Sequence, residues 1–111
     1  MTFCTFDTYQ TEARTVANYP DNLPVIYSAL ALAGEAGEVA NKVKKIYRDD
    51  GGLVTDDRRA QIKKELGDVL WYVAALCSDL GLKMRDVAVG NINMLIDRKQ
   101  RNVLHGDGDD R

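Results

Sequence analysis

The sequence predicts an all-α fold, a four-helix bundle-like chain. Apolar residues recur at steps of three and four along most of the chain, and strand-like alternation is nowhere convincing. Breaks at Pro20, at the paired glycines of "DDGGL" and at Gly81 divide the chain into four helical stretches. At 111 residues, the chain has the length of a single domain, residues 1–111.

The first helix is predicted over residues 6–19, with Thr5 or Asp7 as its N-cap and Pro20 at its end. The second helix is predicted from about Leu23 to about Arg48, because Pro24 suits a first helical turn and the paired glycines follow.

The third helix is predicted to start behind Asp56 or Asp57 and to run to Leu80, where Gly81 stops it. The fourth is predicted over residues 84–103. Apolar seams support both central helices. They comprise Leu32, Ala36, Val39, Val43 and Ile46 on the second, and Ile62, Leu66, Val69, Val73, Leu76 and Leu80 on the third.

A further apolar strip runs beside the seam of the third helix and comprises Leu70, Trp71, Ala74 and Cys77. One neighbouring helix cannot cover both strips. A chain this short also buries only about two thirds of its unfolded surface. We therefore expect oligomerisation to complete the bundle.

Composition argues against several classes of partner. The formal net charge is -2, with both signs mixed along the chain, so we expect neither nucleic acid nor a membrane as partner. The two cysteines are too few for a cysteine-rich zinc site. Without a leader or a long apolar run, a cytoplasmic protein is expected.

Two acidic pairs carry the chemical signal. Glu35 and Glu38 share one helix face, and Glu65 and Asp68 repeat that spacing on the next helix. Helices joined by a short loop usually pack antiparallel, so the four carboxylates are predicted to converge. Each pair alone is more often a solvated face.

Four converging carboxylates repel one another unless a cation neutralises them. Oxygen ligands with an open position suit Mg²⁺ better than zinc, and Mg²⁺ commonly binds substrate phosphates. Gly34, Gly37 and Gly67 adjoin these acids, and we expect them to let a helix or a substrate lie close.

Three segments, "LAGEAGEVANKVKK", "KKELGDVLWYVAAL" and "NINMLIDRKQRNVLHGDGDDR", resemble the MazG-like nucleotide pyrophosphohydrolases of the all-α nucleoside triphosphate pyrophosphatase superfamily. The resemblance implies hydrolysis of a nucleoside triphosphate between the α and β phosphates by a water bound to Mg²⁺, or to Mn²⁺ as a substitute. It implies homodimers, or dimers of dimers, that share helices at the site. By position, the catalytic metal ligands are Glu35, Glu38, Glu65 and Asp68.

Other residues are candidates for binding the substrate. Tyr72 is a candidate for stacking on the base, and Trp71 is interpreted as core. Contacts to the rest of the substrate are expected from Lys42, Lys45, Asn91, Arg98 and Arg101. The tail "HGDGDDR" reads as disordered on composition, although similar endings in relatives suggest that it folds over the site.

The resemblance leaves some roles open. Gly34 stands where many relatives have glutamate, so the general base is unassigned, and Met94 replaces a lysine that is common in similar small members. Alternatives are a phosphoribosyl-ATP pyrophosphatase or dUTPase-like relative, and a non-enzymatic helical interaction domain that docks through its acidic face.

Overall fold

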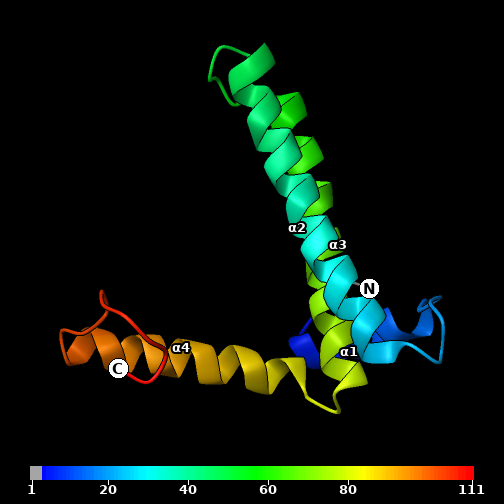
Figure 1. Ribbon diagram of the computed structural model, residues 1–111, viewed down its shortest axis with the longest axis vertical. Coiled ribbons are helices and arrows are strands. Elements are labelled where there is room, and N and C mark those ends of the chain that lie inside the picture. Colours follow the sequence, from blue (N-terminus) through cyan, green and yellow to red (C-terminus); the bar gives the residue numbers. More distant parts are fainter. Residues whose placement is uncertain (1–3) are drawn as a thin grey trace.

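The computed structural model describes residues 4–111, which form four α-helices and no strand (Figure 1). The helices are α1 (Phe6–Thr15), α2 (Pro24–Asp49), α3 (Asp56–Asp79) and α4 (Met84–Gln100). α2 and α3 lie side by side as a long antiparallel hairpin, and α1 packs at its open end. α4 points away from the hairpin as an arm (Figure 1).

The predicted helices are present, with changes at their ends. Thr5 caps α1 through a capping box with Thr8, as expected for this position. α1 ends at Thr15, four residues earlier than predicted, since a residue before proline disfavours the helical conformation and Tyr19 is engaged elsewhere. Thr55, and not an aspartate, caps α3 by accepting a hydrogen bond from the Arg58 amide.

The end of α4 also differs from the prediction. The helix stops at Gln100, and Asn102 takes a left-handed conformation with φ 59°, which is typical of a helix terminus. The following residues therefore turn back and do not continue the helix to residue 103.

The seam between α2 and α3 repeats at steps of four and three, as in coiled coils. Apolar and polar residues alternate among the buried and half-buried positions of this seam. These positions are Ser28, Leu32, Glu35, Val39, Lys42 and Ile46 on α2, and Arg58, Ile62, Glu65, Val69, Tyr72, Leu76 and Asp79 on α3. The predicted seam was wrong at Ala36, Val43, Leu66 and Leu80, which are exposed. The packed face lies one residue earlier and passes through Glu35, Lys42 and Glu65.

Polar pairs cross this seam at heptad intervals. Ser28 Oγ lies 2.8 Å from Asp79 Oδ2, and Lys42 Nζ lies 3.7 Å from Glu65 Oε1. The two pairs are separated by fourteen residues on each helix, so the register of the hairpin is constant between them. The seam therefore places charged side chains from the two helices directly opposite each other.

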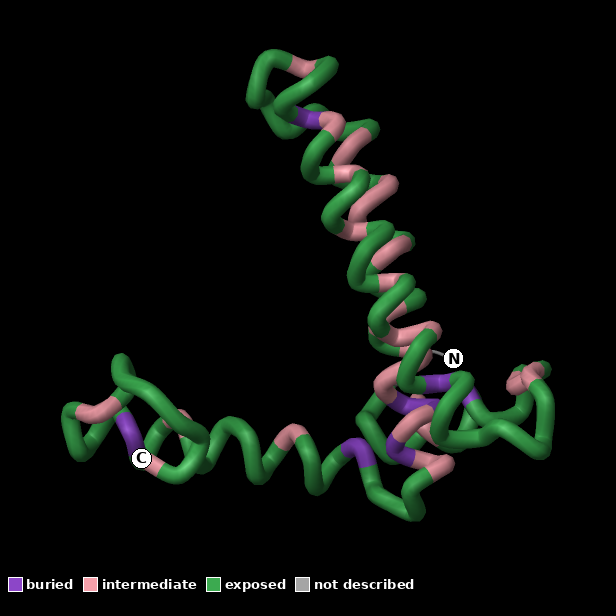
Figure 2. The backbone as a smooth tube through the Cα atoms, in the orientation of Figure 1, coloured by how far each residue is buried: buried purple, intermediate pink, exposed green. Residues whose placement is uncertain are grey.

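The core lies at the base of the hairpin, where α1, α3 and the start of α4 meet. Ala13, Ala74, Cys77 and Met84 form its buried cluster, and Trp71 packs against it. Figure 2 shows most of the buried positions gathered there, whereas α2 and α3 are only half-buried along most of their length. The predicted additional strip on α3 is thus covered by α1 at Ala74 and Cys77, while Leu70 remains 38% exposed.

The single chain does not close into a bundle. Its radius of gyration is 16.9 Å, whereas a compact chain of this length has about 13 Å. Its accessible surface is 8066 Å², against about 6,100 Å² for a folded monomer of this mass. A Gln10 side chain fixes the start of the arm, accepting from the Met84 amide at 2.8 Å and donating to the Leu82 carbonyl at 2.9 Å.

Membrane insertion is not supported by the helices. Within residues 4–111, none of them combines the length and the apolar character that a membrane span requires.

Candidate metal centre

The structure brings three of the four predicted carboxylates together. Glu35 of α2 and Glu65 and Asp68 of α3 each offer an oxygen, and these oxygens all lie within 4.8 Å of one another. The arrangement follows from the hairpin, because Glu35 and Glu65 occupy seam positions on facing helices and Asp68 lies one turn along from Glu65.

Glu38 lies outside this triad. It is exposed one turn further along α2, where its charge still contributes to raising the pKa of Glu35. The fourth predicted ligand is therefore adjacent to the triad and not part of it in the single chain.

The triad carries unbalanced negative charge. Burial, followed by the charges of Asp68, Glu65 and Glu38, raises the pKa of Glu35 above the ordinary value of a glutamate. Among residues 4–111, Lys42 is the only cation that forms an ion pair with a triad carboxylate; it pairs with Glu65, and the two side chains are 23% and 17% exposed. One ammonium group cannot neutralise three carboxylates, so a divalent cation fits the donor set.

An open cleft of about 390 Å³ adjoins the triad. Glu35 and Asp68 contribute the acidic part of its lining, and the remainder comes from Val16, Asn18, Tyr19, Trp71 and Tyr72. Trp71 and Tyr72 meet edge to face at 4.9 Å, and burial is the main cause that raises the pKa of Tyr72. The cleft thus joins carboxylates to an aromatic wall.

The aromatic wall extends one sequence interpretation, that of Trp71, and corrects another, that of Tyr19. Trp71 packs against the core, as predicted, but it also lines the cleft. The sequence predicts Tyr19 to be part of the first helix, without a role in the site, whereas it lies in the connection between α1 and α2 and lines the cleft. Pro20, which disfavours a helical Tyr19, was the signal that could have revealed this connection.

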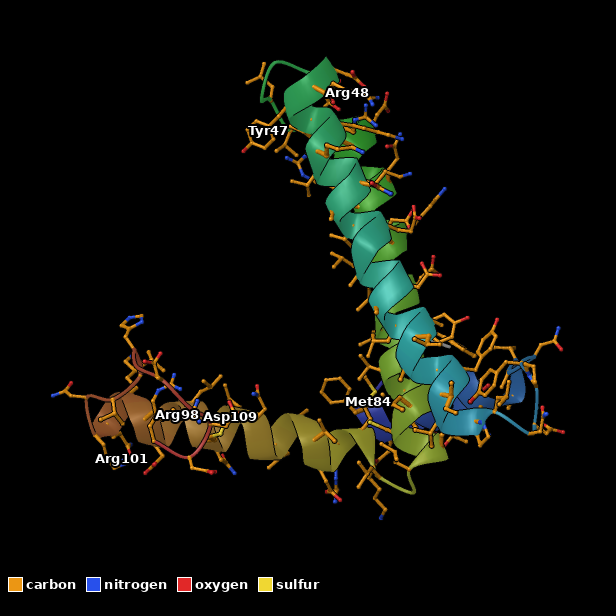
Figure 3. The ribbon with its side chains drawn as sticks, viewed as in Figure 1. Tyr47, Arg48, Met84, Arg98, Arg101 and Asp109 are labelled. Carbon is orange, nitrogen blue, oxygen red and sulfur yellow. The ribbon has the colours of Figure 1, made fainter. Side chains whose placement is uncertain are left out.

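The predicted phosphate-binding cations are dispersed. Lys42 lies beside the triad, where it forms an ion pair with Glu65, and Lys45 is partly buried one turn further along α2. Asn91 and Arg98 lie on α4, which leads away from the hairpin (Figure 3), and Arg101 follows directly after the last residue of this helix. The single chain therefore does not bring the α4 residues to the carboxylates.

Arg98 and Arg101 instead hold the tail of their own chain. Arg98 is 4% exposed and donates to the Asp109 carbonyl, while its Nε is buried without a hydrogen-bond partner in the described chain. Arg101 donates to the Arg111 carbonyl at 2.8 Å. Figure 3 shows the tail lying over the end of α4, so it covers its own helix and not the carboxylates of the same chain.

The glycines beside the acids face open space. A Cβ built at Gly34, Gly37 or Gly67 meets no atom within 4 Å beyond the local helix. No helix of residues 4–111 approaches them closely, so the close contact expected of these glycines is absent from the single chain.

Comparisons with known proteins agree with the all-helical fold. Residues 27–103 match the MazG nucleotide pyrophosphohydrolase domain, a region that contains all of α2 except its first turn, and the whole of α3 and α4. The chain is 45% identical over 111 residues to the Gene 37 protein of Mycobacterium phage L5, covering 95% of this chain and 97% of that protein. No solved structure matches it. By this match over most of its length, the chain belongs to the MazG nucleotide pyrophosphohydrolase domain family.

Proposed function

We propose that this protein hydrolyses nucleoside or deoxynucleoside triphosphates to the monophosphate and pyrophosphate, with Mg²⁺ as cofactor and Mn²⁺ as a substitute. The observation that supports this most strongly is the triad of Glu35, Glu65 and Asp68, which opens on an aromatic cleft in a chain of the MazG family.

The triad is the proposed metal site. Its ligands are carboxylate oxygens only, the donors that a hard divalent cation prefers. Glu38 is the proposed fourth ligand, since it is exposed and lies one turn from Glu35 on the same helix. A divalent cation held there would lower the pKa of water and neutralise phosphate oxygens during in-line displacement.

The remaining groups of the cleft suit a nucleotide. Tyr72 and Trp71 offer aromatic surface beside the carboxylates, so a base and a metal-bound phosphate chain have places within one cleft. Lys42, next to Glu65, is the proposed donor to the phosphates from within the same chain.

We also propose that a second copy of the chain completes the site, as a homodimer or a dimer of dimers. The single chain exposes more surface than a folded monomer of its mass, and its α4 arm carries Asn91, Arg98 and Arg101 away from its own triad. An arm of this kind can deliver Asn91, together with the tail that Arg98 and Arg101 hold, to the cleft of a partner.

A substrate panel tests the activity. The purified protein is incubated with each ribo- and deoxyribonucleoside triphosphate, with Mg²⁺ or with EDTA, and the products are separated. We expect monophosphate and pyrophosphate with Mg²⁺ only. Asp68→Asn keeps the side-chain shape but removes one ligand charge, so it should lower kcat at least a hundredfold, whereas Asp57→Asn at the exposed start of α3 should not.

Other products identify other functions. Diphosphate with inorganic phosphate would exclude a pyrophosphohydrolase while leaving a metal site possible. Absence of any divalent-dependent cleavage across the panel would instead favour the acidic face as a docking surface.

A further inference from the structure

A buried carboxylate outside the triad holds together the α1–α2 connection. Asp79, the last residue of α3, has a side chain that is 0% exposed. A carboxylate at a helix C-terminus faces the negative end of the helix dipole, so it needs donors to remain ionised there.

Three side chains from other parts of the chain supply those donors. The Tyr19 hydroxyl lies 2.7 and 2.9 Å from the two Asp79 oxygens, Ser28 Oγ lies 2.8 Å from Oδ2, and Arg14 Nη1 lies 3.0 Å from Oδ1. Burial opposes ionisation, but the hydrogen bonds from Tyr19, Ser28 and Arg14 outweigh it, and the pKa of Asp79 is below its ordinary value.

Tyr19 is the member of this cluster that reaches the cleft. Its ring is stacked on Tyr27, with centroids 5.3 Å apart, and meets Trp71 edge to face at 6.3 Å. The same ring lines the cleft that holds Glu35 and Asp68, together with its neighbour Asn18. Asp79 is not part of the cleft lining, so its influence on the cleft passes through Tyr19.

Apart from the Tyr19 side chain, few interactions fix the connection between α1 and α2. Residues 16–23 form no helix or strand, and their backbone hydrogen bonds to one another and to α1 are short-range turns. A segment without regular structure keeps one conformation only where side chains anchor it. Here the anchor is the Tyr19 side chain, bonded at its hydroxyl and packed on both sides of its ring.

We propose that Asp79 is a positioning residue that fixes Tyr19 and the 16–23 connection as one wall of the substrate cleft, and that this wall binds the organic part of the nucleotide. The inference rests on the proposed function. Because Tyr19 supplies none of the triad's donor atoms and the wall is in place before reaction, it should contribute equally to ground-state and transition-state binding.

Steady-state kinetics of Tyr19→Phe and Asp79→Asn test the role. We expect each to raise KM for the best triphosphate about tenfold, the change that corresponds to one lost hydrogen bond to a charged group, with kcat within about threefold of wild type. The double variant should raise KM no further than the larger single change, since both substitutions act on the same Tyr19–Asp79 hydrogen bond.

Matched controls separate positioning from a structural effect. Tyr47→Phe removes a hydroxyl from an exposed tyrosine on α2, and Asp57→Asn neutralises an exposed aspartate on α3. Both should leave KM unchanged. Stabilisation by Mg²⁺, measured as the rise in melting temperature over EDTA, should persist in Tyr19→Phe, because its triad is intact.

The possible outcomes distinguish this inference from the proposed function. Unchanged KM in Tyr19→Phe with a normal wild-type activity would overturn the positioning role and leave the activity standing, even if Asp79→Asn failed to fold. If wild type does not hydrolyse any triphosphate, nucleotide binding followed by Trp71 fluorescence replaces KM. Tighter binding to wild type than to Tyr19→Phe would then support the wall, and equal or absent binding would overturn it.

Discussion

The exposed face of α4 provides the sharpest test of assembly. Val89, Ile92 and Ile96 form a stripe along this helix and are 49%, 52% and 48% exposed in the single chain. The chain exposes about 1,900 Å² more than a compact monomer of its mass, which is the area that a sizeable subunit interface would remove. We therefore expect Ile92 to be buried between copies, and Ile92→Asp to weaken assembly.

The expected loss of association free energy follows from the exposed half of the Ile92 side chain. Full burial of an isoleucine stabilises by about 1.5–3 kcal/mol, so covering the half that is still exposed contributes about half of that per copy. A symmetric dimer contains two copies, so losing both costs about 1.5–3 kcal/mol, a roughly 10- to 150-fold weaker association. An unpaired aspartate in a dry interface would add to this cost.

Light scattering coupled to size exclusion measures the result. Wild type should have at least twice the 12.4 kDa mass of one chain, and Ile92→Asp should shift toward monomer on dilution. Asn93→Asp adds the same charge on the next exposed residue of α4 and serves as the control. A wild-type monomer with a radius of gyration near 16.9 Å would refute the reasoning, because the open chain would then be stable alone.

Three further predictions concern the triad. At about 100 times its Kd, Mg²⁺ should stabilise the folded protein by about 2.7 kcal/mol, which is measured as a rise of several degrees in melting temperature. Glu35→Gln should reduce this rise more than Glu38→Gln, because only Glu35 belongs to the triad. Equal losses in the two variants would place both carboxylates in the site. In EDTA, the melting temperature should fall as the pH increases from the ordinary glutamate pKa of 4.5 through the raised pKa of Glu35, because the folded state holds this proton more tightly than the unfolded state. Mg²⁺ should remove this fall, and a melting temperature in EDTA that does not depend on pH would contradict the charge repulsion. Lys42→Met should lower the Mg²⁺ concentration needed for half-maximal stabilisation, because the ammonium group no longer competes with Mg²⁺ for the Glu65 carboxylate. An increase in the Mg²⁺ concentration needed would show that Lys42 supports the metal site.

The sequence by itself determined where the helices lie and that neighbouring helices carry acidic pairs with the same spacing. Helix identity depends on periodicity and on local stop signals such as Gly81 and the paired glycines, and these are read within a few residues. The short loop between α2 and α3 leaves an antiparallel hairpin as the favoured arrangement, which brings Glu35 opposite Glu65 and Asp68. Three of the four expected carboxylates could therefore be placed together from sequence alone.

Tertiary structure decided everything that depends on which atoms meet across the chain. The seam passes through Glu35 and Lys42, and not through Ala36 and Val43, because helix rotation is set by the whole set of cross-helix contacts, including the ion pair of Lys42 with Glu65. Tyr19 leaves the helix pattern to reach a carboxylate 60 residues away, and no local signal reports that partner. The direction of α4, and the engagement of Arg98 by its own tail, likewise follow from contacts that only the folded chain brings into reach.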